Sequence, residues 1–498
     1  MKVSLISPYP DITCFGLRTM SAHLKDHGHQ TQLIFLPDPQ GDDLVMGKRH
    51  FNESVLAQTA ALCADSDLIG LTLMTNHFEA AVEISAYLKS KSDRPIVWGG
   101  VHPTVRPEEC LQHADLVCVG EGEDVILDLA NRMDRGEDLS DVPNIWLRKD
   151  GQVIRNDVRP LEMNLDVYPI PDYSGEDHHV MYKGTVKPLD YDLTQILLAR
   201  GTVADHLHHV GYQTMTGRGC PHQCTYCIND AIKCMYGKRG YLRWRSNDHV
   251  MSELLWVKKH MPYVGYVWIS DDAFIARSQD SIDEFCGRYK ENIDLPFSCL
   301  VSPLTVTEKK MERLVDAGLI YIQMGVESGS PHMQEVYNRP HMNNERTLKA
   351  MHIINEHKDR MQPPGYDFLL DAPYETDEDR IESLRLIAQI PKPFRLQPFA
   401  LVLYPGTELH DRAKADGLIG DERRDVYNKS WTMKKLSYLN LLFVLSRGGR
   451  LPPAVLRFLI SRPVLVVMNN RVTKYLSGYA YLMLWTIYRF CKRAMGKK

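Results

Sequence analysis

Short apolar runs alternate with amphipathic stretches along the first 150 residues of the chain. The runs have the length of buried strands, and the stretches between them repeat apolar residues at helical spacing. The expected strands cover 2–9, 31–37, 68–74, 95–100 and 115–122, and the expected helices cover 17–28, 77–91 and 123–136. This alternation predicts a doubly wound parallel α/β sheet, whose ligands bind beyond the carboxyl ends of the strands.

The same alternation returns after residue 195. Further strands are expected at 211–217, 263–272, 296–302, 319–329, 365–373 and 394–407, and helices at 281–292, 307–318 and 377–390. Six strands with helices between them predict a full or partial (β/α) barrel. Polar side chains follow several strands, at the end of a barrel where active sites lie; they are Asp271, Asp272, Glu327, Ser328 and Asp371.

The periodic pattern weakens between these two regions, where four prolines fall: Pro160, Pro169, Pro171 and Pro188. We therefore expect a connecting segment between two domains, because 498 residues exceed what one hydrophobic core usually supports. The expected division is a first domain at 1–148, a connecting segment at 149–194, a barrel at 195–410 and a helical region at 411–498.

Composition adds one asymmetry to an otherwise ordinary globular chain with 44% apolar and 24% charged residues. Residues 432–498 hold 13 Lys and Arg and no Asp or Glu, which leaves a net charge of −17 on the rest of the chain against −4 overall. The eleven cysteines form no disulfide framework, and no signal segment precedes them. A reducing, cytoplasmic location is the simpler interpretation.

Three cysteines stand close together in "GRGCPHQCTYC", residues 217–227: Cys220, Cys224 and Cys227. A closed zinc site needs four ligands and a disulfide needs two, whereas three thiolates can hold three irons of a four-iron cluster and leave the fourth iron open. A zinc site completed by Cys234 or His222, or three buried thiols, are the alternatives.

The spacing Cys-x3-Cys-x2-Cys after the first barrel strand resembles the hallmark of the radical S-adenosylmethionine superfamily. The resemblance implies a [4Fe-4S] cluster on Cys220, Cys224 and Cys227, with S-adenosylmethionine bound at the open iron. It also implies a 5′-deoxyadenosyl radical that removes a hydrogen from the substrate, so that the three cysteines are catalytic as well as metal-binding.

Later segments strengthen the resemblance over about residues 195–410. "VWISDDAF", "MGVESGS" and "YPGT" are similar to stretches of that superfamily, and "LDAPYET" resembles its Gly-x-Pro-Gly-Glu-Thr, with Tyr374 in place of the second glycine. The resemblance implies cofactor contacts at the cysteine loop and the strand ends, from Tyr226, Asp271, Asp272, Glu327 and Ser328.

The first domain resembles a cobalamin-binding domain. "IGLTLM" matches a Gly-x-Ser-x-Leu strand end with Thr72 in the serine position, "VWGGVHP" supplies Gly99 and Gly100 for the nucleotide tail, and "VGEGE" adds Glu121. The loop "SPYPDITCFG" contains no histidine, so we expect cobalt to be held without a protein imidazole. A flavodoxin-like domain without cobalamin, or a nucleotide-binding sheet, is the alternative.

Together these features predict a cobalamin-dependent radical S-adenosylmethionine enzyme that methylates an unactivated carbon of an apolar, lipid-like or natural-product substrate. Oxidative cyclisation is the alternative reaction, and a non-catalytic cobalamin and iron-sulfur sensor is a third. The expected partners are a small-molecule substrate and an external electron donor such as flavodoxin or ferredoxin, without nucleic acid.

Two further features carry separate expectations. The histidine clusters, His178 with His179 and His206 with His208 and His209, are expected to be solvated loop residues rather than substrate contacts. The basic region 432–498 is expected to rest on the inner face of a membrane. Its longest uncharged run, 475–488, is too short to span one; a helical cap on the barrel is the alternative.

Overall fold

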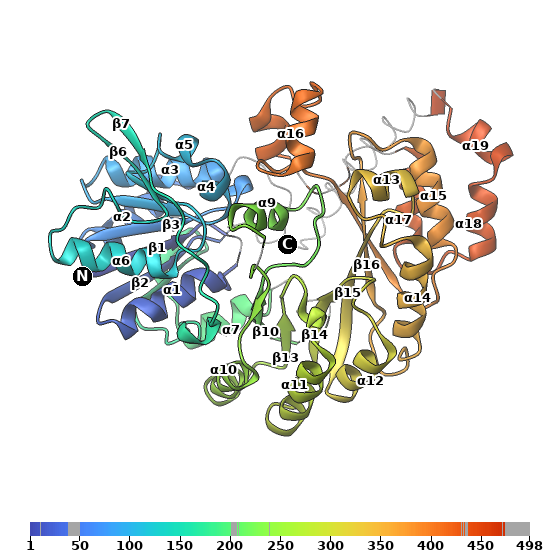
Figure 1. Cartoon of the computed structure of the whole chain (residues 1–498), viewed down its shortest axis with the longest axis horizontal. Coiled ribbons are helices and arrows are strands. Elements are labelled where there is room, and N and C mark those ends of the chain that lie inside the picture. Colours follow the sequence, from blue (N-terminus) through green and yellow to red (C-terminus); the bar gives the residue numbers. More distant parts are fainter. Residues whose placement is uncertain are drawn as a thin grey trace.

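Two sheets lie side by side in the computed structural model, one in each half of the chain (Figure 1). The structure describes residues 1–9, 11–37, 50–200, 207, 209–238, 240–429, 431, 433, 437–470 and 472–473. The first sheet has nine strands in the order β7-β6-β5-β4-β3-β1-β2-β8-β9, and the second has six in the order β10-β13-β14-β15-β16-β17. A two-stranded ribbon, β11–β12, accompanies them.

The centre of the first sheet is parallel, as predicted. Its parallel strands are β1 (Lys2–Ser7), β2 (Gln30–Phe35), β3 (Leu68–Thr72), β4 (Ile96–Gly99), β5 (Leu116–Cys118) and β8 (His178–Tyr182). Antiparallel strands close both edges: β6 (Ile145–Lys149), β7 (Gln152–Arg155) and β9 (Thr185–Pro188). The described helices around it are α1 (Phe15–Asp26), α2 (Glu53–Cys63), α3 (Phe78–Lys89), α4 (Val101–Val105), α5 (Pro107–Cys110) and α6 (Glu123–Asp134).

Helices cover both faces of this sheet because successive strand residues point to opposite sides. Leu5 and Leu33 belong to the hydrophobic core with α1 and α6, whereas Ile6 and Ile34 belong to the core with α2 and α3. Both faces are therefore buried, which explains why the strands are continuously apolar rather than alternating. The doubly wound arrangement expected from the sequence is confirmed.

The segment expected to connect the domains contributes strands to the first sheet. β8 pairs with the edge strand β2, and β9 folds back on β8. His178, expected to be a solvated loop residue, is 2% exposed on β8, and its Nε2 lies 3.2 Å from Asp172 Oδ2. That expectation was wrong because local sequence does not reveal that the segment adds to a distant sheet edge. His206 and His208 lie outside the described residues.

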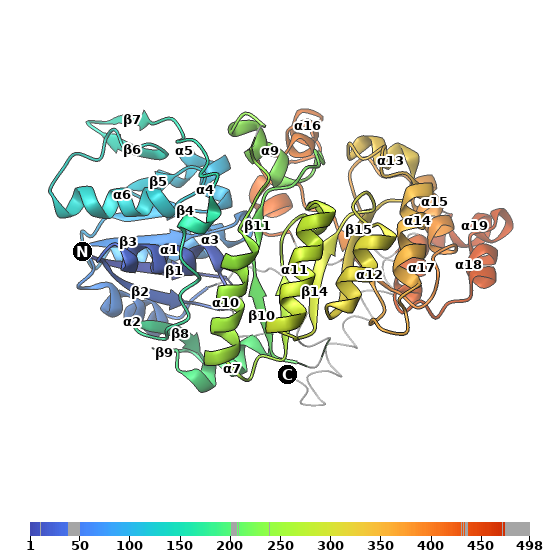
Figure 2. The ribbon, with the colours of Figure 1, turned by 60° about the horizontal axis from the view of Figure 1, so that its bottom comes forward.

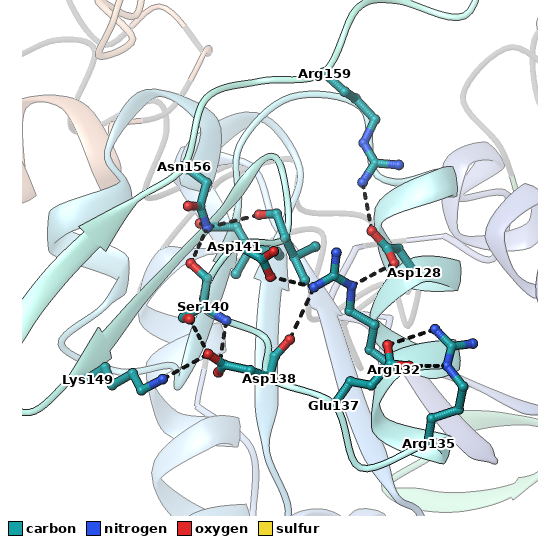
Figure 3. A network of polar contacts seen from close by, with 12 residues as sticks. Asp128, Arg132, Arg135, Glu137, Asp138, Ser140, Asp141, Lys149, Asn156 and Arg159 are labelled. Atoms are coloured by element: carbon teal, nitrogen blue, oxygen red, sulfur yellow. Dashed lines mark hydrogen bonds and ion pairs between the residues drawn. The ribbon is translucent and has the colours of Figure 1, made fainter.

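A surface network joins the start of this segment to α6 (Figure 3). Arg132 of α6 binds Asp128 one turn earlier and Asp141 in the following loop, while Arg159 also reaches Asp128 at 3.4 Å. Asn156 donates to the carbonyls of Ser140, Val142 and Ile145. Several ion pairs of this network are exposed, and each contributes little to the stability of the fold.

The second sheet is a partial barrel of six parallel strands, as predicted. They are β10 (Gly211–Thr214), β13 (Tyr266–Ile269), β14 (Phe297–Val301), β15 (Leu319–Glu327), β16 (Gly365–Leu370) and β17 (Arg395–Ala400). Helices on its outer side are α10 (Asn247–His260), α11 (Gln279–Asn292), α12 (Glu308–Asp316), α14 (Asn344–Asn355) and α15 (Asp377–Ile387). Turning the molecule by 60° shows this helical layer in front of the strands (Figure 2).

Short helices follow the last barrel strand: α16 (Glu408–Ala415), α17 (Tyr438–Ser446), α18 (Pro453–Leu459) and α19 (Arg462–Met468). α17 packs on α15 and β17, and α18 and α19 lie at the end of the molecule farthest from the first sheet (Figure 1). Among the described residues, no helix is both long and apolar enough to cross a membrane. The run 475–488 lies outside the described residues.

Candidate active site

The three cysteines lie on the loop that begins at the carboxyl end of β10. The chain passes from β10 through β11 (Gly217–Arg218) to Cys220, Cys224 and Cys227, and α9 (Ile228–Met235) starts directly after the third cysteine. Cys224 is buried, and the other two are half-buried. Cys234, the alternative fourth ligand, is exposed on α9.

The donor set suits an iron-sulfur cluster better than a single metal ion. Among the described residues, no three His, Cys, Asp or Glu side chains are placed to hold one metal ion. In a four-iron cluster each cysteine binds a different iron, so the three sulfurs need not converge on one point. Burial raises the pKa of Cys220 to about 11 and that of Cys227 to about 12, so iron binding must displace their protons.

A buried arginine links the cysteine loop to the barrel strands. Arg339 Nη1 lies 3.4 Å from Cys224 Sγ and 3.3 Å from Tyr226 Oη, and its Nη2 donates to the Gly325 carbonyl at 2.7 Å. Glu327, at the end of β15, has a φ of 68°, a left-handed conformation that is uncommon outside glycine. Burial raises the pKa of Glu327, and Arg339 opposes that rise. Cys224, Tyr226 and Glu327 therefore surround one cation.

The other predicted barrel residues have different surroundings. Asp271 is 2% exposed and accepts hydrogen bonds from Thr216 N at 2.5 Å and Thr216 Oγ1 at 2.6 Å. Asp272 is exposed, and its carboxylate contributes to the raised pKa of Cys220 and Cys227. Ser328 is buried, with Oγ 3.2 Å from Ser383 Oγ. Asp272 thus faces the cysteines, whereas Asp271 and Ser328 support neighbouring backbone.

Tyr374, which replaces the usual glycine, lies in the turn between β16 and α15, and its side chain packs against the end of α16. Its hydroxyl donates to Asp416 Oδ2 at 2.7 Å, and Arg412 sits 4.3 Å from the ring centroid. The following Glu375 accepts from Asp371 N at 2.9 Å. The Tyr374 side chain is therefore accommodated by α16. Glu375, in the same turn, stays hydrogen-bonded to the residue after β16.

The predicted cobalamin edge of the first sheet is built from backbone and small side chains. Thr72 Oγ1 lies 3.3 Å from Tyr9 Oη. A side chain added at Gly99 would meet only Cys118 Cβ, at 3.7 Å. At Gly100, with a φ of 101°, an added Cβ would lie 2.9 Å from both Leu73 O and Thr72 Oγ1. Gly100 is thus required by its own turn, whereas Gly99 leaves its backbone open to a ligand.

The histidines of this edge are enclosed by protein groups. His102 is fully buried, its Nδ1 lies 3.0 Å from Thr75 Oγ1, and its Nε2 lies 3.5 Å from Glu109. The ring of His77 packs 5.0 Å from that of Tyr9. The first loop offers no imidazole, so cobalt without a protein histidine remains the prediction.

Glu121, predicted to bind a cofactor, joins the two domains. Arg218 Nη1 lies 3.1 Å from its Oε2, and Arg243 of β12 (Arg243–Trp244) forms a second ion pair with the same carboxylate. Its backbone N donates to Tyr236 Oη at 3.0 Å. We call Glu121, Arg218, Arg243 and Tyr236 the interdomain clamp. It holds the loop after β5 against both sides of the cysteine loop.

Sequence reasoning missed Arg339, Arg218 and Arg243. Arg218 lies within the cysteine motif and the other two lie outside it, but none of them carries a local signal, because tertiary contacts determine their partners. It also missed Gln323 of β15 and Asp367 of β16, whose side chains are hydrogen-bonded to each other; a polar residue inside an otherwise apolar strand was the one signal available.

Two family models match the chain. Residues 1–130 match the B12 binding domain, and residues 214–387 match the radical SAM superfamily. The expected pair of domains is thereby confirmed, and with it the expected cofactors: a [4Fe-4S] cluster, S-adenosylmethionine and cobalamin. The arrangement is that of an enzyme.

Three curated relatives are each 25% identical to the chain. An uncharacterised methyltransferase of Pyrococcus horikoshii aligns over 71% of both chains, and the bacteriochlorophyllide d C-8(2)-methyltransferase of Chlorobaculum tepidum over 76% of this chain and 75% of its own. The anaerobic magnesium-protoporphyrin IX monomethyl ester cyclase of Synechocystis sp. aligns over 51% of this chain and 44% of its own.

A solved structure shares the fold. The radical S-adenosylmethionine methyltransferase TsrM from Kitasatospora setae superposes with a TM-score of 0.64 at 17% identity, over 84% of this chain and 76% of that protein. The likeness extends over both sheets, so the side-by-side arrangement of the two domains recurs in another protein of this architecture.

Proposed function

We propose that this chain, which belongs to the cobalamin-dependent radical S-adenosylmethionine enzymes, transfers a methyl group to an unactivated carbon of an apolar substrate. The observation that carries the proposal is the interdomain clamp. Arg218 precedes Cys220 by two residues, and both Arg218 and Arg243 bind Glu121 of the first domain. When bound, the cluster and S-adenosylmethionine supply hydrogen abstraction, and cobalamin supplies the methyl group.

The residues of the chain bind and orient in this proposal. Cys220, Cys224 and Cys227 hold three irons as thiolates, and Arg339 stabilises the thiolate of Cys224 by donating to its sulfur. Glu327 and Tyr226 contact S-adenosylmethionine beside that cation. Asp272 lies at the same loop, and Thr72, Gly99 and Gly100 form the cobalamin edge. We assign cobalamin binding to residues 1–148 and radical chemistry to 195–410.

Two of the three relatives are methyltransferases, which supports methyl transfer over the second candidate, oxidative cyclisation. The cyclase aligns over a shorter part of this chain than the methyltransferases do. A reductant such as flavodoxin or ferredoxin would deliver electrons to the cluster. The carbon methylated and the substrate around it are left to experiment.

Product analysis with labelled S-adenosylmethionine tests the reaction. The full chain, reconstituted with iron, sulfide and cobalamin and then reduced, is incubated with S-adenosylmethionine carrying a deuterated methyl group. A methyltransferase produces S-adenosylhomocysteine, with the label recovered on cobalamin, and also 5′-deoxyadenosine. 5′-Deoxyadenosine without S-adenosylhomocysteine would favour the cyclase reaction, and neither product would indicate a sensor.

We also propose that the C-terminal helices rest on a lipid surface and bring the enzyme to apolar substrates. Phe458 is 65% exposed, Val466 67% and Val467 63%. Exposed arginines accompany them, including Arg457 and Arg462, and no acid occurs after residue 431. Exposed apolar side chains beside cations suit the surface of an anionic bilayer.

Flotation of the full chain with phosphatidylserine vesicles at low and high salt tests this contact. We expect the protein to float at low salt, and the triple variant F458S/V466S/V467S to stay with the soluble fraction. A matched triple change on exposed polar positions of α11, D280S/E284S/K290S, should float like the wild type. If the wild type stays soluble under both conditions, these helices serve as a cap on the barrel.

A further inference from the structure

The inner face of the barrel sheet carries polar side chains opposite a continuously apolar outer face. On β15 and β16, Ile322, Met324, Tyr366 and Phe368 are fully buried beneath the outer helices. The alternating residues Gln323, Asp367 and Leu369 are half-buried, because they point to the other side of the sheet. The carboxyl group of Asp367, in the middle of β16, is therefore unusual for a strand of this kind.

Asp367 has one satisfied and one unsatisfied oxygen. Its Oδ2 accepts a hydrogen bond from Gln323 Nε2 at 2.8 Å, on the neighbouring strand. Its Oδ1 is buried, with no hydrogen-bond partner anywhere in the described chain. Leaving a buried acceptor unpaired destabilises the fold, and such groups mark positions that a ligand or water completes. Burial, with help from Glu327, also raises the pKa of Asp367 well above its usual range.

The position of Asp367 places it beside the predicted cofactor residues. Asp367 pairs in register with Gly325 on β15 and with Gln397 on β17. Glu327 folds back over Gly325, so that a Cβ added there would meet its Oε1. The carboxyl groups of Asp367 and Glu327 thus lie near each other, because Glu327 folds back over Gly325, the residue that pairs with Asp367. A carboxylate entering this site would be a third acidic group beside Asp367 and Glu327 and would be disfavoured, whereas a cationic amine would lower the pKa of Asp367 and stabilise the carboxylate that accepts its hydrogen bond.

We propose that Asp367, oriented by Gln323, binds a hydrogen-bond donor of the substrate, an amine or a hydroxyl group. The inference rests on the proposed function only in assigning that group to the substrate. Leu369 and Phe399, paired in register one step nearer the strand ends, are half-buried and offer contact to an apolar body. Asp367 is a specificity residue: it orients the substrate and forms no bond to the reacting carbon.

Three probes with one apolar body test this assignment: 2-phenylethylamine, 2-phenylethanol and phenylacetate. Their binding to the reconstituted full chain is measured by isothermal titration in the presence of S-adenosylmethionine. We expect the amine and the alcohol to bind at least about tenfold more tightly than phenylacetate. Asp367→Asn should weaken amine binding by about tenfold, and Gln323→Leu by a smaller factor, because Asp367 then loses the group that orients it.

The matched control is Asp359→Asn, an exposed acid of the same domain, which should bind all three probes like the wild type. Iron content and melting temperature report whether each variant folds. If Asp367→Asn does not fold, the binding of the probes to Gln323→Leu tests the inference. Equal binding of amine and carboxylate by the wild type, or amine binding unchanged in both variants, overturns the inference. Loss of S-adenosylhomocysteine formation with probe selectivity intact would overturn only the proposed function.

Discussion

The two proposed cofactor edges of this protein are built from different kinds of residue. The edge of the first sheet offers Thr72 and the backbone of Gly99 and Gly100, whereas the edge of the barrel offers cysteines, Arg339 and Glu327. Their acids differ as well: Glu123 at the first edge has a lowered pKa, because Arg218 outweighs its burial, while burial raises the pKa of Asp271 to about 6.

This contrast suits the ligand that we propose for each edge. Cobalamin is large and is held by shape, so the first edge needs room and rigid turns. A cluster with S-adenosylmethionine is compact and charged, so the barrel edge needs thiolates and buried charges whose fields act strongly at low dielectric. Bulky substitutions should therefore damage the first edge, and changes of charge or ligand should damage the second.

The largest effect is expected at the cysteines. Replacing Cys220, Cys224 or Cys227 by Ala should remove most of the roughly four irons expected per chain and lower 5′-deoxyadenosine formation by about a thousandfold or more. Iron analysis and chromatography measure both. The control is Cys234→Ala, which changes an exposed cysteine seven residues beyond Cys227 and should retain the cluster. Stoichiometric zinc in the purified protein, lost in the Cys234 variant, would favour the alternative site.

The next largest effect is expected from a bulky substitution at the first edge, which should weaken cobalamin binding. Gly99→Leu should weaken cobalamin binding by about tenfold to a hundredfold, since overpacking costs about 1–3 kcal/mol, with the iron content unchanged. Absorbance titration with hydroxocobalamin measures it. Gly287→Leu, where an added Cβ meets nothing within 4 Å, is the control. Gly100→Leu should instead fail to fold. A Gly99 variant that binds cobalamin normally would show that the ligand lies elsewhere.

Acids with a raised pKa in one domain and acids with a lowered pKa in the other predict that the stability of the two domains depends on pH in opposite directions. Burial raises the pKa of Asp271 to about 6 and that of Glu375 to about 7. Such groups bind protons more tightly when folded, so their stabilisation is complete below the unfolded pKa of about 4 and is lost as pH rises towards the folded pKa. Glu123 and Asp172 have lowered pKa values, so the first domain should lose stability as pH falls below about 4.

Hydrogen exchange, followed by peptide for each domain, measures this difference. Between about pH 4 and pH 7 we expect the barrel strands to lose about 2 kcal/mol of opening free energy while the first sheet does not. Asp271→Asn should remove part of the slope, whereas Asp280→Asn, an exposed acid on α11, should leave it unchanged. A parallel response of both domains would contradict the contrast.

The interdomain clamp gives the smallest expected effect and tests whether the two edges are independent. Glu121→Gln should loosen the loop after β5 by about 1 kcal/mol, because the carboxylate is partly exposed and its Arg218 and Arg243 partners keep other contacts. Faster exchange at residues 119–123 and in α9, with unchanged iron and cobalamin content, is the expected result. Glu137→Gln, an exposed partner of Arg135, serves as control. No change in exchange would mean that Tyr236 alone fixes the loop.

Much of the architecture follows from the sequence, because strand and helix periodicity and the cysteine spacing are local properties. The run 365–373 became β16 over Gly365–Leu370, and the run 123–136 became α6 over Glu123–Asp134. The three cysteines on one loop after the first barrel strand could be placed for the same reason. Each of these inferences needs only residues within one turn or a few strand positions.

Tertiary structure alone decided which distant groups meet. Glu121 pairs with Arg243, 122 residues away, and Arg339 reaches Cys224 from 115 residues away. β8 joins the first sheet because β2 leaves an open edge there, which no pattern near His178 signals. In the sequence, Asp367 is only a polar residue within an apolar strand; once the barrel forms, its Oδ1 is buried beside Glu327 with no hydrogen-bond partner among the described residues. Local patterns specify elements, but the packing of those elements determines which charges are paired and which are left for a ligand.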